Sequence, residues 1–394
     1  MKFMFMAIPA AYLLGNIYII ARGWQGLNAL LPLLHCSRGA AICIKVTFAL
    51  LMAGIASSLF IALFGRNAEL PQWLLGGMYN IGSIWLVFTL YMVLELLAVD
   101  LLRIFVWHQP LKEYGFAAAF LFTAVLLIYG YGNYRNPRIE EVTIDLSKDG
   151  SSGRKEARIV AVSDVHLGFA TRKKHLQRYV EKINSLTPDI ILIGGDLIDN
   201  SIKPVEQQRM QEELGMLQAP GGIFMVPGNH EYISEMADVE AFLQKTPIVL
   251  LRDSVVMHPC GVAIAGRDDR SNRYRLPVEE LLKGIKNATS STPTEDSEDV
   301  TFAEKFACPV ILLDHQPYEV AHKDSLGVDV QFSGHTHRGQ VWPMSLLVDN
   351  MYEQSHGYRK WNNSHVIVSS GLSLWGPPFR IGTNSDLWVI NLKY

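Results

Sequence analysis

Four long apolar segments in the first 134 residues constrain the fold of this 394-residue chain more than any other feature. They lie at about residues 3–21, 41–64, 74–99 and 115–131. A helix needs about 20 apolar residues to cross the roughly 30 Å hydrocarbon core of a bilayer, and these segments have about that length. Residues 1–134 also contain only seven Lys or Arg and four Asp or Glu residues, too few for the surface helices of a soluble domain. We therefore expect four transmembrane helices.

Composition excludes some classes of protein for the rest of the chain. The formal net charge is -3, so the chain lacks the basic surface of a nucleic-acid-binding protein, and we expect no nucleic-acid partner. Four cysteines without a C-x-x-C pair argue against a disulfide scaffold and against a zinc ribbon. The oligomeric state stays open.

Basic residues near the ends of the apolar segments predict the orientation in the membrane. Five lie on the face of the first and third loops, and four lie on the opposite face. The first group is Arg22, Arg38, Lys45, Arg103 and Lys112, and the second is Lys2, Arg66, Arg135 and Arg138. Because cytoplasmic loops carry the excess of Lys and Arg, we expect the C-terminal part to lie outside the cytoplasm.

The sequence of the C-terminal part is typical of an α/β domain. A linker and a first strand occupy residues 135–154, and short apolar runs then alternate with helical patterns through residues 155–394. This alternation predicts an α/β sandwich. Polar residues follow five of the predicted strands: Asp164, His166, Asp196, Asp199, Asn229, His230, His315, His335 and His337. Because ligands bind where the strands of such sheets end, we expect these side chains to converge.

The mixture of Asp, His and Asn indicates a metal centre. Such ligands suit borderline cations such as Mn²⁺, Fe or Zn²⁺ better than Ca²⁺ or Mg²⁺. Two such ions about 3.5–4 Å apart commonly catalyse displacement at phosphorus. Each residue alone has a simpler explanation, since an Asp after a strand often caps a helix and a lone His is often only solvated. Together they predict a two-metal site.

The order D-x-H, G-G-D-x-x-D, G-N-H-E, a lone His and G-H-T-H resembles the calcineurin-like metallophosphoesterase family, in particular its membrane-associated bacterial branch. The resemblance covers about residues 155–394 and extends to the closing Ser369-Ser370-Gly371-Leu372, Pro377 and Arg380. It implies a four-layer sandwich of two mixed β-sheets flanked by helices, here following a transmembrane region of four helices at residues 1–134.

The resemblance also implies roles for the polar residues. One metal would take Asp164, His166, Asp196 and His337, and the other would take Asp196, Asn229, His315 and His335. Asp196 would bridge the two ions, for which Mn²⁺ is expected first. His230 would stabilise or protonate the leaving oxygen, oriented by Asp199 or Glu231. Alternatively, Asp199 is an ordinary turn residue.

These expectations combine into a membrane-anchored, metal-dependent phosphoesterase in a bacterial inner membrane. The bond hydrolysed would be a phosphodiester, phosphomonoester or pyrophosphate. A lipid or lipid-linked substrate is expected because the linker is short and because Trp342, Trp361 and Trp375 could form an apolar rim. The alternatives are a tethered nucleotide or cell-wall phosphoesterase, and a transporter or sensor with a regulatory phosphoesterase domain. Only Glu95 and Asp100 in the apolar segments suggest transport.

Overall fold

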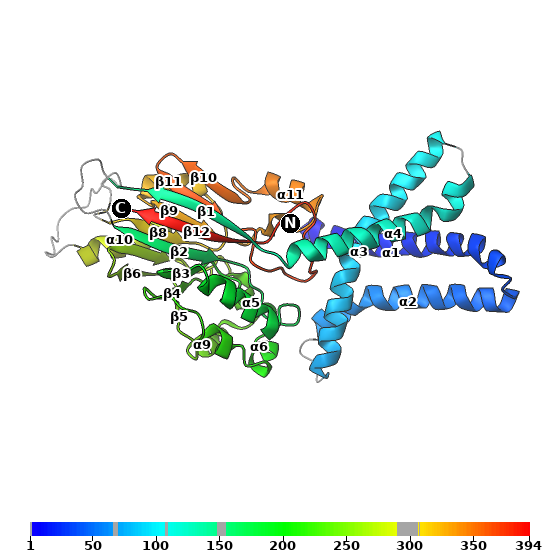
Figure 1. The fold of residues 1–394 in the computed structure, drawn as a ribbon, viewed down its shortest axis with the longest axis horizontal. Helices are drawn as coiled ribbons and strands as arrows, with labels where there is room; N and C mark the ends of the chain where they lie inside the picture. Colours follow the sequence, from blue (N-terminus) through cyan, green and yellow to red (C-terminus); the bar gives the residue numbers. More distant parts are fainter. Residues whose placement is uncertain (1, 66–69, 107–108, 148–154, 290–305, 307) are drawn as a thin grey trace. The chain divides into compact units, whose positions relative to one another are not determined.

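The computed structural model describes residues 2–65, 70–106, 109–147, 155–289, 306 and 308–394 (Figure 1). The chain forms two compact units. The first contains Met1–Gly132 and Gly376–Phe379, and the second contains Asn133–Trp375 and Arg380–Tyr394. The sequence has a Ser-, Thr-, Glu- and Asp-rich segment at residues 286–304, of which residues 290–304 lie outside the described residues.

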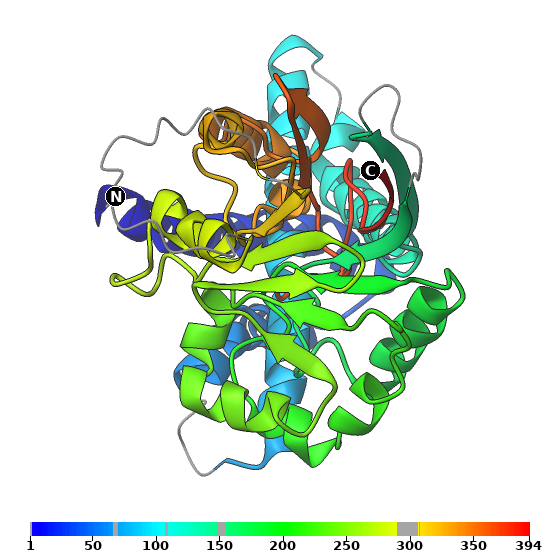
Figure 2. The same cartoon turned by 90° about the vertical axis from the view of Figure 1, so that its left-hand side faces the viewer.

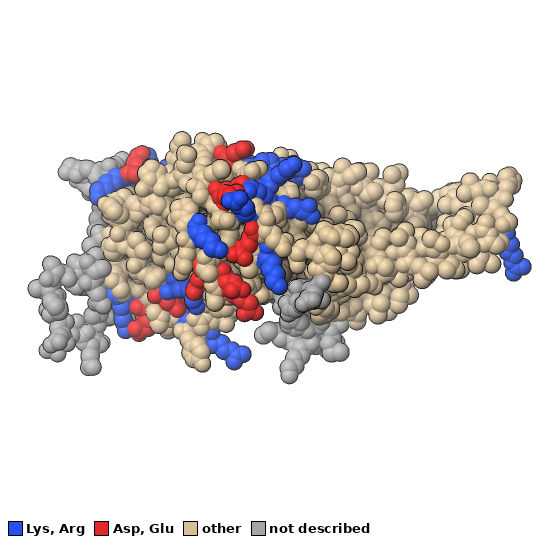
Figure 3. All heavy atoms as spheres, turned by 90° about the horizontal axis from the view of Figure 1, so that it is seen from below, with Lys and Arg blue, Asp and Glu red and all other residues tan. Residues whose placement is uncertain are grey.

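The first unit is helical. Its helices are α1 (Lys2–Leu30), α2 (Arg38–Phe64), α3 (Gln72–Phe105) and α4 (Gln109–Tyr134). Among the described residues, three helices are long and apolar enough to cross a membrane: Arg38–Phe64, Gln72–Phe105 and Tyr114–Tyr134. On the face seen in Figure 3, this unit shows almost no charged side chains.

The prediction of four membrane-spanning helices is therefore corrected to three. The remaining helix, α1, is not among the helices that meet these criteria within the described residues. Asn16 accepts a hydrogen bond from Trp85 Nε1 at 2.7 Å, and the guanidinium of Arg22 lies 2.9 Å from Asp100. These contacts tie α1 to α3 through polar groups as well as through apolar packing.

The second unit contains two six-stranded mixed sheets. The first has the order β1 (Arg138–Asp145), β12 (Asp386–Lys393), β2 (Glu156–Val162), β3 (Ile190–Ile193), β4 (Ile223–Met225) and β5 (Ile248–Leu250). The second has the order β10 (Gly357–Trp361), β11 (Ser364–Val368), β9 (Val330–Ser333), β8 (Val310–Leu313), β7 (Val262–Gly266) and β6 (Ser254–His258). Strands β2 to β5 are parallel, as are β7, β8, β9 and β11.

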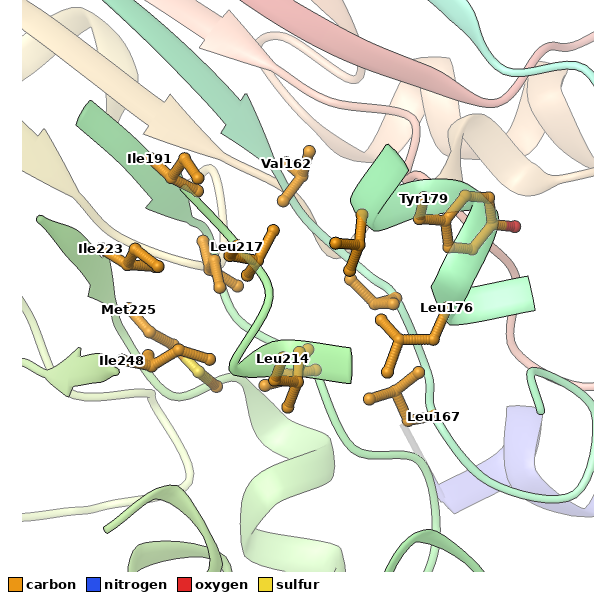
Figure 4. Packing of buried hydrophobic residues seen from close by; sticks show 14 of the residues in the cluster. Val162, Leu167, Leu176, Tyr179, Ile191, Leu214, Leu217, Ile223, Met225 and Ile248 are labelled. Atoms are coloured by element: carbon orange, nitrogen blue, oxygen red, sulfur yellow. The ribbon is translucent and has the colours of Figure 1, made fainter. Parts of the chain in front are cut away.

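Alternating apolar residues in the strands build the layers, because successive side chains point to opposite faces of a sheet. In β2, Ile159 packs with Ile264 and Phe332 of the second sheet, whereas Val162 packs beneath helices (Figure 4). The helices over the first sheet are α5 (Lys173–Asn184), α6 (Lys203–Gln207), α7 (Gln211–Leu214) and α9 (Met236–Leu243). Helix α10 (Val278–Thr289) covers the second sheet from the opposite side (Figure 2). The predicted four-layer sandwich is confirmed.

The second unit begins inside the last turn of α4. The Asn133 side-chain amide donates hydrogen bonds to the carbonyl oxygens of Arg380, at 3.1 Å, and of Thr383, at 2.7 Å. The Tyr134 hydroxyl lies 3.2 Å from Ser373 Oγ. Both residues therefore belong to the fold of the α/β domain, although they are the last residues of a membrane-spanning helix.

Candidate metal centre

The structure brings together all of the polar residues that the sequence singles out. Each group follows the end of a parallel strand: β2, β3 and β4 in the first sheet, and β8 and β9 in the second. The residues are Asp164 and His166 after β2, Asp196 and Asp199 after β3, Asn229 and His230 after β4, His315 after β8, and His335 and His337 after β9. The strand ends meet at one edge of the sandwich because neighbouring parallel strands end on the same side.

The backbone at this edge is strained. The φ angles of Asp164, His166, Asp196, His335 and His337 are 55°, 48°, 53°, 70° and 47°. Residues other than glycine rarely adopt this left-handed region, at a cost of roughly 1–3 kcal/mol each. Such strain persists only where surrounding contacts hold it, and it concentrates at functional sites.

A buried carboxylate holds the loop of Asp196. Glu231 accepts hydrogen bonds from the backbone N–H groups of Asp196 at 2.9 Å, Ile198 at 2.9 Å and Gly228 at 2.7 Å. Burial and the neighbouring charge of Asp196 raise the pKa of Glu231 to about 7. Gly228 is required here, because a Cβ at that position would lie 2.1 Å from Asp196 Oδ1.

The first half-site contains Asp164, His166 and His337, whose ligand atoms lie within 4.8 Å of one another. His337 Nε2 is 3.4 Å from Asp164 Oδ1 and 3.1 Å from His166 Nε2. Burial lowers the pKa of His166, but the carboxylates of Asp164 and Asp199 outweigh it and raise the pKa to about 10. The half-site thus concentrates negative charge around two imidazoles.

The second half-site contains Asp196, His315 and His335 within the same limit. Asp196 Oδ2 lies 3.2 Å from His315 Nε2 and 3.7 Å from His166 Nε2 of the first half-site. A single carboxylate oxygen therefore faces both half-sites, which is the position that a bridging ligand needs.

The donor atoms fit divalent metal ions. Asn229 Oδ1 and His337 Nδ1 are buried and have no hydrogen-bond partner among the described residues. Buried polar atoms normally find a partner, so these two atoms are suited to bind a ligand. Carboxylate oxygens and imidazole nitrogens in two adjoining groups match the chemistry of a pair of borderline cations.

His230 lies beside both half-sites. Its Nδ1 is 3.2 Å from Asp199 Oδ1, and its ring centre is 6.4 Å from that of Trp375. Burial lowers the pKa of His230, but the charges of Asp196 and Asp199 outweigh it and raise the pKa. The carboxylate beside the His230 ring is that of Asp199. The carboxylate of Glu231 instead accepts hydrogen bonds from backbone N–H groups.

Residues 157–339 match the model of the calcineurin-like phosphoesterase family. The chain carries a calcineurin-like metallophosphoesterase domain. An uncharacterized metallophosphoesterase of Helicobacter pylori strain J99 is 33% identical over 265 residues, which are 66% of this chain and 65% of that protein. A transmembrane protein with metallophosphoesterase domain from Danio rerio is 33% identical over 291 residues, covering 70% of this chain and 62% of that protein. This chain therefore spans less than two thirds of the length of either relative.

A third relative is nearly as long as the part of this chain that it matches. An uncharacterized metallophosphoesterase of Aquifex aeolicus is 29% identical over 279 residues, which are 69% of this chain and 98% of that protein. The matched part of this chain therefore corresponds to nearly the whole of that relative.

A buried arginine, Arg380, supports the metallophosphoesterase domain. The sequence motif contains this arginine but predicts no role for it. Arg380 is 0% exposed, and its Nη1 donates a hydrogen bond to the His337 carbonyl oxygen at 2.6 Å. Its Nη2 donates to the carbonyl oxygens of Ser370 and Ser373. Burial lowers the pKa of Arg380 to about 10. Arg380 thus fixes the strained loop of His337, and its only signal in the sequence is the closing S-S-G-L motif with the arginine after it.

Proposed function

We propose that the protein is a membrane-anchored phosphoesterase that uses two divalent metal ions, Mn²⁺ first, to hydrolyse a lipid or lipid-linked substrate. The bond is a phosphodiester, phosphomonoester or pyrophosphate. The family of the domain and the paired half-sites support hydrolysis at phosphorus. Three apolar helices support the membrane anchor. The bacterial relatives and the distribution of basic residues support a bacterial inner membrane, with the catalytic domain outside the cytoplasm.

The residues divide the chemistry between them. Divalent ions held at the two half-sites would activate a water and neutralise charge on the phosphoryl oxygens. Asp164, His166, Asp196 and His337 would hold one ion, and Asp196, Asn229, His315 and His335 would hold the other. His230 donates a proton to the leaving oxygen from Nε2, because its Nδ1 faces the carboxylate of Asp199. Asp199 is a positioning residue in this scheme.

The observation that carries the lipid substrate is an exposed apolar segment directly after the metal-ligand loop. Helix α11 (Met344–Met351) begins seven residues after His337. Trp342, Leu346, Leu347 and Met351 are 49–60% exposed, although each is large and apolar. Exposed apolar groups of this kind are typical of surfaces that contact lipid or a partner.

The length of the linker supports the same conclusion. Three residues separate Tyr134, the end of α4, from Arg138, the start of β1. An extended chain covers at most about 3.6 Å per residue, so the domain is held within a short distance of the bilayer. A substrate embedded in the membrane therefore reaches a high effective concentration at the domain.

One observation favours a nucleotide as the second candidate substrate. The guanidinium of Arg270 lies 4.3 Å from the ring centre of Tyr318, whose ring is 5.2 Å from that of Tyr352. The ring of Tyr352 is 6.3 Å from that of the ligand His335. Such a series of rings and a cation is suited to a flat base next to a phosphate.

The two candidates are separated with purified full-length protein in detergent with Mn²⁺. We expect higher kcat/KM on a long-chain lipid phosphate or pyrophosphate than on its short-chain soluble analogue or on nucleotides. Leu346→Ser with Leu347→Ser should lower kcat/KM on the long-chain lipid and leave hydrolysis of p-nitrophenyl phosphate unchanged. Met216→Ser, at a methionine that is 58% exposed, is the matched control. Preference for nucleotides, with no effect of the double variant on lipid hydrolysis, would refute the lipid substrate.

A further inference from the structure

We infer that the protein has a second phosphate-binding site, separate from the metal centre, which takes the phosphate of an anionic phospholipid headgroup. The site is a cavity of about 180 Å³ in the second unit. Its lining includes Tyr134 and Arg135 at the end of α4 and His175, Arg178, Tyr179 and Lys182 of α5. The inference does not depend on which substrate the metal centre hydrolyses.

The spacing of the α5 residues places Arg178 and Lys182 on one wall of the cavity, together with His175 and Tyr179. Positions 178, 179 and 182 lie three, four and seven residues after position 175, so the four side chains share one face of the helix. Arg135 faces them from the short segment between α4 and β1. The cavity has room for a phosphate group and not for acyl chains, which would remain in the bilayer.

The cavity carries an excess of positive charge. Arg135, Arg178 and Lys182 line it, and no carboxylate does so among the described residues. Burial, together with the charges of Arg178, Arg135 and Arg172, lowers the pKa of His175 to about 4. Burial also lowers the pKa of Lys182. The charges of the arginines beside His175 disfavour a further cation here and favour an anion.

The position of the cavity in the chain indicates a lipid as the source of the phosphate. Tyr134 is the last residue of the membrane-spanning segment Tyr114–Tyr134, and Arg135 is the next residue. Arg135 therefore adjoins the end of a candidate membrane span, where the chain would reach the level of the headgroups. Basic residues directly beside a membrane span attract anionic lipids. Free inorganic phosphate has the same charge and hydrogen-bonding chemistry and is the second source to test.

The test is a binding titration of full-length protein in dodecyl maltoside by native mass spectrometry. The probes are dioleoyl phosphatidylglycerol and dioleoyl phosphatidylcholine, each with and without 10 mM inorganic phosphate as competitor. Arg178→Gln removes an exposed cation from the cavity wall. Lys174→Gln removes an exposed cation from α5 outside the cavity and is the matched control. Size-exclusion profiles and melting curves verify that both variants fold.

We expect phosphatidylglycerol to bind more tightly than phosphatidylcholine. Arg178→Gln should weaken its binding about fivefold, as for the loss of one basic group near a membrane, and Lys174→Gln should not. If inorganic phosphate leaves this difference intact, the source is lipid. If it abolishes the difference, the site takes free phosphate as well. Equal effects of Arg178→Gln and Lys174→Gln, or equal binding of the two lipids, overturn the inference.

Discussion

Replacing Glu231 with glutamine tests whether the geometry of the metal centre depends on a side chain that binds no metal. One carboxylate oxygen accepts hydrogen bonds from the N–H groups of Asp196 and Gly228, and the other accepts from Ile198. Glutamine has a single acceptor oxygen. Glu231→Gln therefore turns an NH₂ group toward at least one of these backbone donors.

The expected loss of stability follows from the hydrogen bonds that Glu231→Gln removes. Losing one hydrogen bond to a charged group costs about 1.5–3 kcal/mol. Removing a buried charge offsets part of this cost, since burial already raises the pKa of Glu231 to about 7. A net destabilisation of about 2 kcal/mol corresponds to a fall in Tm of about 4–8 °C for a domain of this size. The strained backbone of Asp196 should also relax, so Mn²⁺ affinity should fall roughly 10- to 100-fold.

The assay is thermal unfolding of full-length protein in detergent, together with calorimetric titration of Mn²⁺. Glu240→Gln is the control, because it makes the same chemical change at a half-exposed glutamate that pairs with Arg252. A surface ion pair contributes about 0–1 kcal/mol, so this control should change little. If Glu231→Gln behaves like Glu240→Gln in both Tm and Mn²⁺ affinity, the positioning role of Glu231 is refuted.

Four further outcomes are expected. Asp196→Asn should abolish turnover and bound metal as measured by elemental analysis, because it removes the negative charge shared by both half-sites; two bound metals with full activity would contradict the bridging role. His230→Gln should slow hydrolysis roughly 10²–10⁴-fold, the usual range for a general acid, with a smaller loss on p-nitrophenyl phosphate, whose leaving group needs little protonation. The depressed pKa of His175 means that the folded state binds its proton less tightly than the unfolded state, so melting temperature should fall as pH drops from 6.5 towards 4. His175→Gln should flatten that slope, and an unchanged slope would exclude the residue as its cause. A periplasmic reporter fused after Tyr394 should be active, and an inactive fusion would reverse the proposed orientation.

The convergence of these Asp and His side chains could be predicted from the sequence because its signals are local. An Asp or His directly after a buried apolar run marks the end of a strand, and parallel strands bring those ends together. Asp164 and His337 are thus neighbours in space although 173 positions separate them in the chain. The four-layer sandwich could be predicted for a related reason, since the strands are short, apolar and separated by helical patterns.

The supporting contacts could not be predicted because they use backbone groups. Glu231 binds N–H groups, and Arg380 binds carbonyl oxygens, so neither interaction leaves a pattern of side chains in the sequence. The prediction of four membrane-spanning helices exceeds the three that the described residues support. The polar contacts of Asn16 and Arg22 with α3 could not be predicted either, because they depend on tertiary structure.

The last turn of α4 has a practical consequence for any soluble version of the protein. Cutting the chain after Tyr134 looks natural from the helix boundary, but it removes the side chains that contact the carbonyl oxygen of Arg380 and the hydroxyl of Ser373. Arg380 in turn holds the carbonyl oxygen of His337. A fragment that starts at Asn133 keeps this support, whereas one that starts at Arg135 loses it. Any foreign anchor grafted in place of α4 must for the same reason retain its final Asn-Tyr pair.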